Sequence, residues 1–443
     1  MISGCTILIF LIAIISLDPL NAFRINQVND LPENGKIWAL LVAGSNTWDN
    51  YRHQADVCHS YQVLHNHGIP DDQIIVMMYD DIAHNNLNPT KGIVLNHPNG
   101  MDVYKGVLKD YTKDDVTPEI FLSVLQGNKS AVEGKGSGRV IESGPADHIF
   151  VYFADHGAPG ILAFPEGELH ARPFNQALLR MYKQKKFSKM VLYIEACESG
   201  SMFNKLLSKN ISVFVTTAAN PSESSYACYF DEKRETYLGD VYSVKWLEDS
   251  DKEILKAETL KKQFQIVKRE TNTSHVQEYG DLSIANLKVA EFQGAAACNC
   301  LNRFSPVPLE PVVSSDVPIM ILKQKMQRTN SVDEQSQLKR QLNKLMQNRQ
   351  FLEDKVKDIV RKLTFTENQF SQIMNERFEL EDFDCYEDVA TYFSASCFSL
   401  SKNDYALRFM YIFVNMCETG IKREVQKMAL DSVCIHPPIY NIK

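Results

Sequence analysis

Short, almost continuously apolar runs recur through the first half of the chain, and each leads into a turn rich in polar or small residues. Runs without polar alternation are typical of strands that are buried on both faces of a sheet. The predicted strands cover residues 37–43, 73–79, 148–153, 189–194 and 211–216. Helical patterns are seen at residues 53–67 and 172–186. Strands that alternate with helices predict an α/β fold, with a mostly parallel sheet flanked by helices.

The pattern changes near residue 295, which suggests a second folded unit. Residues 295–330 are rich in proline, as in a linker between domains. From about residue 319 to 379 the sequence is polar and helix-periodic, which predicts a solvated helical region with one packed face. A length of 443 residues also exceeds what one hydrophobic core usually supports. We therefore expect an α/β domain at 23–294, a Pro-rich linker at 295–330 and a small all-α unit at 331–443.

The N-terminus has the pattern of a secretory signal peptide. Ile7–Leu17 is apolar but too short to cross a bilayer, and small residues near Ala22 fit a cleavage site, so residues 1–22 are predicted to be removed. The alternative is a buried strand or helix. No later stretch is long and apolar enough to predict a membrane helix. Secretory passage also agrees with three glycosylation sequons, at Asn128, Asn210 and Asn272.

Charge and cysteine content narrow the function classes. A net charge of −8 argues against a nucleic-acid binder, which needs a basic face for phosphates. Four cysteines crowd into the C-terminal region, and in an oxidising compartment they predict two disulfides with three possible pairings. A zinc site is the rival interpretation, but the spacing lacks a close Cys-x-x-Cys pair. The four are Cys385, Cys397, Cys417 and Cys434; Cys298 and Cys300 have no assigned role.

His156 and Cys197 each lie just past the end of a predicted strand. Reactive groups in open α/β sheets gather at the carboxyl ends of strands, so the two side chains would meet there if the strands are neighbours. A thiol beside an imidazole is readily ionised and becomes a nucleophile. Taken alone, the cysteine is more simply a small buried residue and the histidine a satisfied polar one. Their shared position at strand ends, close to small residues such as Gly157, favours nucleophilic catalysis.

Five motifs in order indicate a family resemblance. They are Tyr-Arg-His-Gln-Ala-Asp at 51–56, Met-Met-Tyr-Asp-Asp at 77–81, Asp-His-Gly at 155–157, Glu-Ala-Cys-Glu-Ser-Gly at 195–200 and Thr-Thr-Ala-Ala-Asn-Pro at 216–221. Together they resemble the legumain family of asparaginyl endopeptidases. The likeness runs from about residue 36 to 294 and through the C-terminal cysteine pattern. It implies a caspase-like α/β fold, a cysteine endopeptidase activity and no cofactor or metal.

The resemblance assigns roles to individual residues. Cys197 would attack the scissile carbonyl, His156 would move the proton and Asn50 would orient the imidazole. The backbone N–H groups of Gly157 and Cys197 would form the oxyanion hole, and Asp155 matches an aspartate that can convert to a succinimide, a chemistry linked to peptide ligation. Without the resemblance, Asn50 is simply a turn residue.

The resemblance also places the pocket for the residue before the scissile bond. A carboxamide group needs an acceptor for its NH₂ and a donor for its C=O, so walls of both charges would suit asparagine. Aspartate would be accepted once protonated at acid pH. Ion pairing at the surface is the alternative for Arg52 and Asp240. The pocket walls are Arg52, His53, Glu195 and Asp240, and the substrate channel is lined by Ser224, Ser225 and Tyr226.

By the same resemblance, the C-terminal region is an activation peptide followed by a death-domain-like helical prodomain that caps the active site. Asn330 matches the processing site, cut at acid pH, and Arg408 a residue that reaches the acidic side of the site. Carboxylates that hold a cap to cationic partners lose that hold as they become protonated. The disulfides implied by the resemblance are Cys385–Cys417 and Cys397–Cys434.

The expected partners are protein and peptide substrates, the protein's own prodomain and cystatin-type inhibitors, without nucleic acid or membrane. The expected location is the secretory pathway, lysosomal, endosomal or secreted. Two other functions remain open from the sequence. A peptide asparaginyl ligase would use the same scaffold, with an amine intercepting the acyl-enzyme, whereas a binding protein with an inactive site is disfavoured because both Cys197 and His156 are present.

Overall fold

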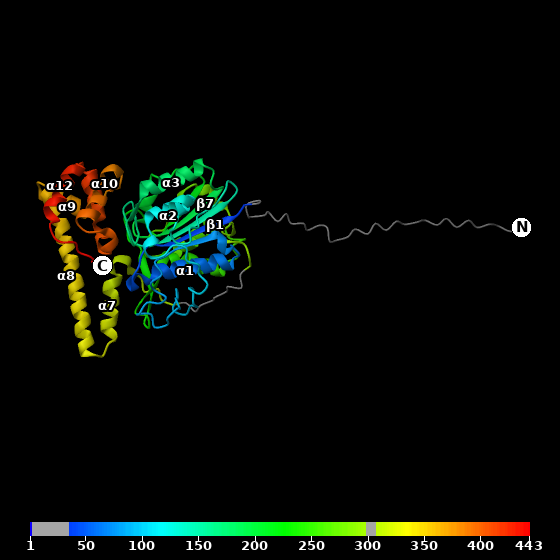
Figure 1. The fold of residues 1–443 in the computed structure, drawn as a ribbon, viewed down its shortest axis with the longest axis horizontal. Helices are drawn as coiled ribbons and strands as arrows, with labels where there is room; N and C mark the ends of the chain where they lie inside the picture. Colours follow the sequence, from blue (N-terminus) through cyan, green and yellow to red (C-terminus); the bar gives the residue numbers. More distant parts are fainter. Residues whose placement is uncertain (2–34, 298–306) are drawn as a thin grey trace.

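The computed structural model describes residues 1, 35–297 and 307–443. Most of the predicted signal peptide, with Cys298 and Cys300, lies outside the described residues. The described residues form two units that pack against each other: a unit built on a sheet and a unit of helices (Figure 1). We refer to them as the sheet unit and the helical unit.

A six-stranded sheet, in the order β11-β8-β7-β3-β1-β2, forms the centre of the sheet unit. Only β11 runs antiparallel to its neighbour, which confirms the prediction of a mostly parallel sheet. All five predicted strands are found, with small differences at their ends. The strands are β1 (Ile37–Ala43), β2 (Ile74–Met77), β3 (His148–Ala154), β7 (Lys189–Glu195), β8 (Val213–Thr217) and β11 (Gln277–Gly280).

Helices cover both faces of this sheet, which explains why its strands are apolar throughout. Successive side chains of a strand point to opposite faces. Val151 of β3 joins a core with Phe121 and Phe174, whereas the next residue, Tyr152, joins a second core with Trp246. The first core is covered by α2 (Pro118–Leu125) and α3 (Ala171–Lys183); the second by α1 (Tyr51–Asn66), α4 (Val241–Lys252), α5 (Leu260–Glu270) and α6 (Ala290–Gln293).

Two three-stranded sheets lie beside the main one. They are β4 (Gly157–Ala158), β5 (Ile161–Ala163) and β6 (Glu168–His170), and β9 (Tyr226–Asp231), β10 (Thr236–Asp240) and β12 (Val312–Val313). β12 and the helix α7 (Val317–Arg328) fall within residues 295–330, so the described part of the expected linker contains ordered elements. Proline does not oppose this helix, because Pro318 stands in its first turn, where a backbone N–H has no helical partner.

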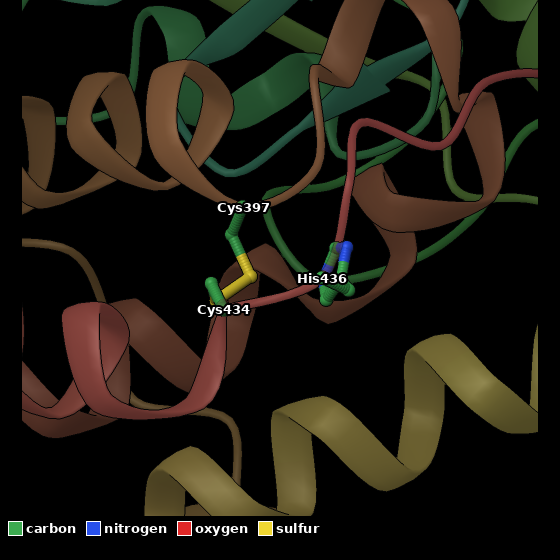
Figure 2. Close-up of side chains that lie close together, drawn as sticks. All are labelled: Cys397, Cys434 and His436. Carbon is green, nitrogen blue, oxygen red and sulfur yellow. A yellow bond between two sulfur atoms is a disulfide. The ribbon is translucent and has the colours of Figure 1, made fainter.

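The helical unit contains a long helix followed by four shorter ones around an apolar core. Two disulfides join its elements, Cys385–Cys417 and Cys397–Cys434, which is the pairing implied by the resemblance. Figure 2 shows the second disulfide with His436 close by. Among the described residues, no helix has the length and apolar character needed to cross a membrane. The helices are α8 (Val332–Leu363), α9 (Glu367–Asn375), α10 (Phe383–Ser396), α11 (Met410–Glu418) and α12 (Arg423–Val433).

Candidate active site

Neighbouring strands bring His156 and Cys197 to one edge of the sheet. β3 and β7 pair directly in parallel, with Ala154 opposite Glu195. His156 and Cys197 each lie two residues beyond these positions, so both follow the carboxyl end of a central strand. The condition stated from the sequence, that the two strands be neighbours, is met. Each residue is buried, with 8% of its surface exposed.

Asn50 follows β1, which borders β3 on the side opposite to β7, and it contacts His156. It ends the short turn before α1, and this turn follows β1, which also neighbours β3. Asn50 Oδ1 lies 2.9 Å from His156 Nε2. An amide oxygen only accepts hydrogen bonds, so this contact places the proton of a neutral imidazole on Nε2. His156 Nδ1 is then left as the acceptor, the atom that could take a proton from a thiol.

The thiol of Cys197 lies in a tight backbone environment. The backbone N–H of Ser225 donates to Cys197 Sγ at 3.3 Å. A Cβ atom added to Gly157 would lie 2.4 Å from the carbonyl oxygen of Cys197, so only glycine permits this close approach. The turn after Cys197 is a single 3-10 turn, Ser199–Met202. The site therefore has the closely spaced backbone that an oxyanion hole requires.

Burial changes the protonation of both reactive groups. It raises the pKa of the Cys197 thiol to about 12, with the charge of Glu198 acting in the same direction. Burial also lowers the pKa of His156 to about 4, against the opposing effect of Asp404. The expectation of a readily ionised thiol is therefore wrong for this state of the molecule. The physical reason is that both groups are covered, which disfavours any charged form.

Beneath this edge lies a buried cluster of mixed charge. Arg52 Nε donates to Asp240 Oδ1 at 2.9 Å, and both side chains are almost fully buried, so this is not the surface ion pair considered from the sequence. His53 Nε2 lies 3.5 Å from Asp240 Oδ2. Glu195 Oε2 accepts from the backbone N–H and the hydroxyl of Ser243, at 3.0 and 2.9 Å. The four residues expected to form one pocket thus lie together.

Two acidic oxygens in this cluster have no hydrogen-bond partner among the described residues. They are Glu195 Oε1 and Asp240 Oδ2. Burial raises the pKa of Glu195 well above its usual range, and the nearby charge of Asp240 adds to the effect. The pKa of Asp240 is also raised by burial, although Arg52 opposes this. Buried acceptors without partners are costly, so the cluster is suited to a ligand that brings N–H donors.

A segment from outside the main sheet crosses the site. We refer to residues 312–316 as the strap. Val313 pairs with Tyr226 of β9, and the N–H of Ser314 donates to the carbonyl of Ser225 at 3.0 Å. Ser314 Oγ accepts from Arg52 Nη2 at 2.7 Å and lies 3.5 Å from His156 Nδ1. The three residues expected to line the substrate channel, Ser224, Ser225 and Tyr226, therefore lie at or next to the strap.

The helical unit closes the remaining side. Asp404 Oδ2 lies 3.7 Å from His156 Nε2 and accepts from Asn50 Nδ2 at 3.3 Å. Arg408 lies 3.8 Å from Asp316 of the strap. A cavity of about 190 Å³ is lined by side chains of both units, among them His156, Cys197, Asp316, Asp404 and Arg408. Sequence reasoning missed Ser314 and Asp404, because no local motif marks a residue whose partner is hundreds of positions away.

The half-buried Glu198 lines the same cavity. Burial raises its pKa to about 8, while the positive charges of Arg377 and Arg408 oppose the shift. Arg377 and Arg408 come from the helical unit, so this unit places two positive charges beside the carboxyl of Glu198. Glu198 directly follows Cys197 in the sequence. Sequence reasoning gave it no role, since a single carboxylate beside a cysteine has no specific meaning.

One cluster at this edge has donor types found in metal sites. The side-chain ligand atoms of His53, Asp155 and His156 lie within 4.8 Å of one another. His53 Nδ1, however, contacts Ser45 Oγ at 2.6 Å and Asp155 at 3.3 Å, and His156 Nε2 faces Asn50. These contacts explain the cluster as a hydrogen-bonded network, without requiring a metal.

The expected processing and glycosylation positions lie on the surface. Asn330 is exposed in the turn between α7 and α8, and the next residue, Ser331, caps α8 through the N–H of Glu334. An exposed turn between helices is accessible to a protease. The three sequon asparagines, Asn128, Asn210 and Asn272, are also exposed.

Comparison with known proteins identifies the relatives of both units. Residues 37–295 match the Peptidase C13 family, and residues 340–434 match the family described as Legumain, prodomain. Legumain of Homo sapiens is 51% identical over 416 residues, covering 92% of this chain and 95% of its own. The vacuolar-processing enzyme delta-isozyme of Arabidopsis thaliana is 39% identical, covering 92% of both sequences.

Hemoglobinase of Schistosoma japonicum is 41% identical over 401 residues, covering 90% of this chain and 92% of its own. Among solved structures, caspase-1 of Spodoptera frugiperda aligns with 56% of this chain and 86% of its own, at 10% identity and a TM-score of 0.34. The family matches extend over the sheet unit and most of the helical unit, and the relatives match nearly the whole sequence. This protein therefore belongs to the peptidase C13 family and is a cysteine endopeptidase that carries a legumain prodomain.

Proposed function

We propose that this endopeptidase cleaves proteins after asparagine, and after aspartate at acid pH, and that it is made as a zymogen activated by acid. The observation that carries the proposal is the buried cluster of Arg52, Glu195 and Asp240, which would form the specificity pocket next to Cys197 and His156. This pocket combines a cationic donor with two acidic oxygens that lack partners among the described residues. It offers both kinds of group that a carboxamide needs.

In the proposed mechanism, His156 Nδ1 takes the proton of Cys197, and the thiolate sulfur attacks the carbonyl carbon of the asparagine. The N–H groups of Gly157 and Cys197 stabilise the oxyanion. The imidazolium then gives its proton to the leaving amine, and water hydrolyses the acyl-enzyme with the imidazole again acting as base. Asn50 holds the other imidazole nitrogen and so fixes the direction of Nδ1; the 2.9 Å contact supports this role.

Specificity would come from hydrogen bonds made in the pocket. The carboxamide oxygen of asparagine accepts from Arg52, and the NH₂ group donates to Glu195 and Asp240. Protonated aspartate presents one O–H donor and one C=O acceptor in nearly the same shape, so it is accepted only where acid keeps it neutral. A residue without these groups leaves the pocket's buried polar atoms unpaired and is strongly rejected.

The strap and the helical unit keep the site closed before activation. Ser314 Oγ accepts a hydrogen bond from the guanidinium of Arg52, and Asp404 lies beside His156. Ion pairs hold the two units together: Lys205 Nζ lies 2.7 Å from carboxylate oxygens of both Glu379 and Glu381. Comparable contacts join Arg172 to Asp384 at 2.6 Å and to Glu387 at 3.0 Å.

Acid would weaken this closure through groups such as Glu379. Its hydrogen bond with Lys205 lowers its pKa below the usual value. A carboxyl whose pKa is lowered contributes stability above its ordinary pKa and loses it as the pH falls. Glu198 acts in the opposite sense, because its raised pKa of about 8 stabilises the closed form at low pH. Acid therefore opens the site only if the stabilisation lost from the ion pairs between the units exceeds the stabilisation that protonated Glu198 provides.

We place the first cut at Asn330, in the exposed turn before α8. α7 has 12 residues, so it separates the strap from Asn330 by about 18 Å. The active site of the same molecule cannot reach this bond while the strap is in place, so a second molecule makes the cut. Acid activation fits an acidic compartment of the secretory pathway, and the exposed sequons agree with that route. Cystatin-type inhibitors are proposed as partners on the resemblance alone.

The purified full-length protein tests the proposal directly. At neutral pH it should not turn over a peptide reporter that ends in asparagine, and at acid pH it should do so after a C-terminal cut whose position N-terminal sequencing identifies. Cys197→Ala should abolish turnover, and a matched reporter ending in glutamine should be a poor substrate. Asn330→Gln should slow the first cut. Full activity without acid, or equal turnover of the two reporters, would refute the proposal.

A further inference from the structure

The segment that follows α12 returns to the junction of the two units. It leaves the disulfide Cys397–Cys434 and passes His436, which Figure 2 shows beside it. The ring of His436 packs against Phe398, with the ring centroids 4.8 Å apart. In Figure 1 the C mark lies between the helical unit and the sheet unit. The packing of His436 against Phe398 therefore helps to fix the position of this segment.

Residues 439–443, which we refer to as the tail, are anchored in the helical unit. Ile442 is fully buried. Its N–H donates to Asn403 Oδ1 at 3.1 Å, and its carbonyl accepts from the N–H of Tyr405 at 3.2 Å. Asn403 Nδ2 donates to the carbonyl of Ile439 at 2.9 Å. Asn403 directly precedes Asp404, so the tail supports the turn that carries Asp404 to the imidazole.

The tail also reaches the sheet unit. Lys443 Nζ lies 2.8 Å from Asp49 Oδ2 and donates to Thr47 Oγ1 at 3.1 Å. Asp49 belongs to the three-residue turn that ends at Asn50. Side-chain exposure at this ion pair is only 23% for Lys443 and 30% for Asp49, so solvent screens it incompletely.

Arg349 of α8 joins the tail to the strap. Its Nε donates to the backbone carbonyl of Lys443 at 2.6 Å, and its Nη1 lies 3.1 Å from Asp316 Oδ1. The residue is 4% exposed, and its guanidinium stacks over the ring of Tyr405 at 4.1 Å. A cut at Asn330 breaks the backbone between α7 and α8 but leaves this bridge intact.

We propose that residues 439–443 act as a latch, which holds the helical unit closed over the active site through Lys443, Asp49 and Arg349. This inference rests on the proposed autoinhibition and adds the element that sets how readily the closed form opens. The ion pairs of Lys205 and Arg172 hold the units together at their periphery. The latch acts at the turn that carries Asn50, so its release frees the catalytic edge itself.

Alkylation of Cys197 by iodoacetamide in the full-length protein at neutral pH measures opening without depending on substrate preference. The modified peptide is followed by mass spectrometry. Lys443→Glu should raise the alkylation rate about threefold to tenfold, because reversal replaces an attraction with a repulsion. Ile442→Ser, which removes the apolar anchor, should do the same. The matched control is Lys362→Glu, since Lys362 is an exposed lysine on α8 that makes no ion pair with a described residue.

Exchanging the two charges of the ion pair between Asp49 and Lys443 provides the decisive measurement. Asp49→Lys combined with Lys443→Glu should return the rate close to that of the wild type, which a general loss of stability in the tail would not allow. An unchanged rate in Lys443→Glu, with Cys197 protected in the wild type, overturns the latch alone. A wild-type Cys197 that reacts as fast as a free cysteine peptide overturns the autoinhibition on which the latch rests.

Discussion

Ser314 Oγ accepts a hydrogen bond from Arg52 Nη2 at 2.7 Å, although 262 positions separate the two residues. The strap therefore places a short hydroxyl where the proposed mechanism places the carboxamide of a substrate. Serine reaches the guanidinium but leaves Glu195 Oε1 and Asp240 Oδ2 without partners among the described residues. The strap thus contacts the guanidinium of Arg52 while lacking the carboxamide that the pocket is proposed to select.

Ser314→Asn should convert the strap from an inhibitor into a substrate. The longer amide can reach the free carboxylate oxygens, so cleavage between residues 314 and 315 at acid pH should rise more than about tenfold over the wild type. Mass spectrometry of the acid-treated protein identifies the new terminus. Ser315→Asn is the matched control, because Ser315 is the next residue along the strap. Absence of the 314–315 cut would remove Ser314 from the proposed substrate position.

Asn50→Ala should lower kcat far more than it changes KM. Without the amide oxygen, the imidazole of His156 loses the contact that fixes its tautomer and orientation, so part of the roughly 10²- to 10⁴-fold contribution of general acid–base catalysis should be lost. The measurement is steady-state turnover of an asparagine reporter by acid-activated enzyme. A change confined to KM would show that Asn50 acts on substrate binding. His156→Ala gives the lower limit of activity for comparison.

Glu379→Gln should shift opening of the site to higher pH and make it less steep. The lowered pKa of Glu379 means that its ionised form stabilises the closed state above the ordinary pKa and that this contribution is lost on acidification. A neutral glutamine lacks the ionised form, so it provides less stabilisation of the closed state at neutral pH and about the same at low pH. Alkylation of Cys197 as a function of pH measures the effect. Glu424→Gln is the control, since the pKa of Glu424 is also lowered but its partners lie within the helical unit.

Glu258→Gln should raise thermal stability at pH 7.5 and leave it nearly unchanged at pH 5. Burial, together with the charge of Asp249, raises the pKa of Glu258 to about 8. A carboxyl with a raised pKa stabilises the fold below its ordinary pKa and loses that effect as the pH rises through about 8. A rise of Tm by about 3 °C at pH 7.5 is expected. The exposed Glu253, in the same acidic cluster, provides the control Glu253→Gln, and equal shifts in both variants would contradict the assignment.

The sequence was sufficient to predict the sheet and the position of His156 and Cys197 just past the ends of two of its strands. Those features depend on apolar runs and on the rule that parallel strands end at one edge, and both are local or general. The contacts of Ser314, Asp404 and Arg349 could not be predicted in this way. Each has its partners in another part of the fold, and no periodicity or spacing marks them. The burial of Arg52 is similar: charge alone suggests a surface, and only the fold shows an interior.

Among the described residues, the disulfide-bonded cysteines and the free cysteines are divided between the two units. Cys385–Cys417 and Cys397–Cys434 both lie within the helical unit, whereas the free cysteines Cys58, Cys197 and Cys228 all belong to the sheet unit. A reducing environment therefore acts in one direction only. It would keep the thiol of Cys197 in its reactive oxidation state and remove the covalent links within the helical unit, so under the proposed autoinhibition reduction would be a second route, besides acid, to an exposed Cys197.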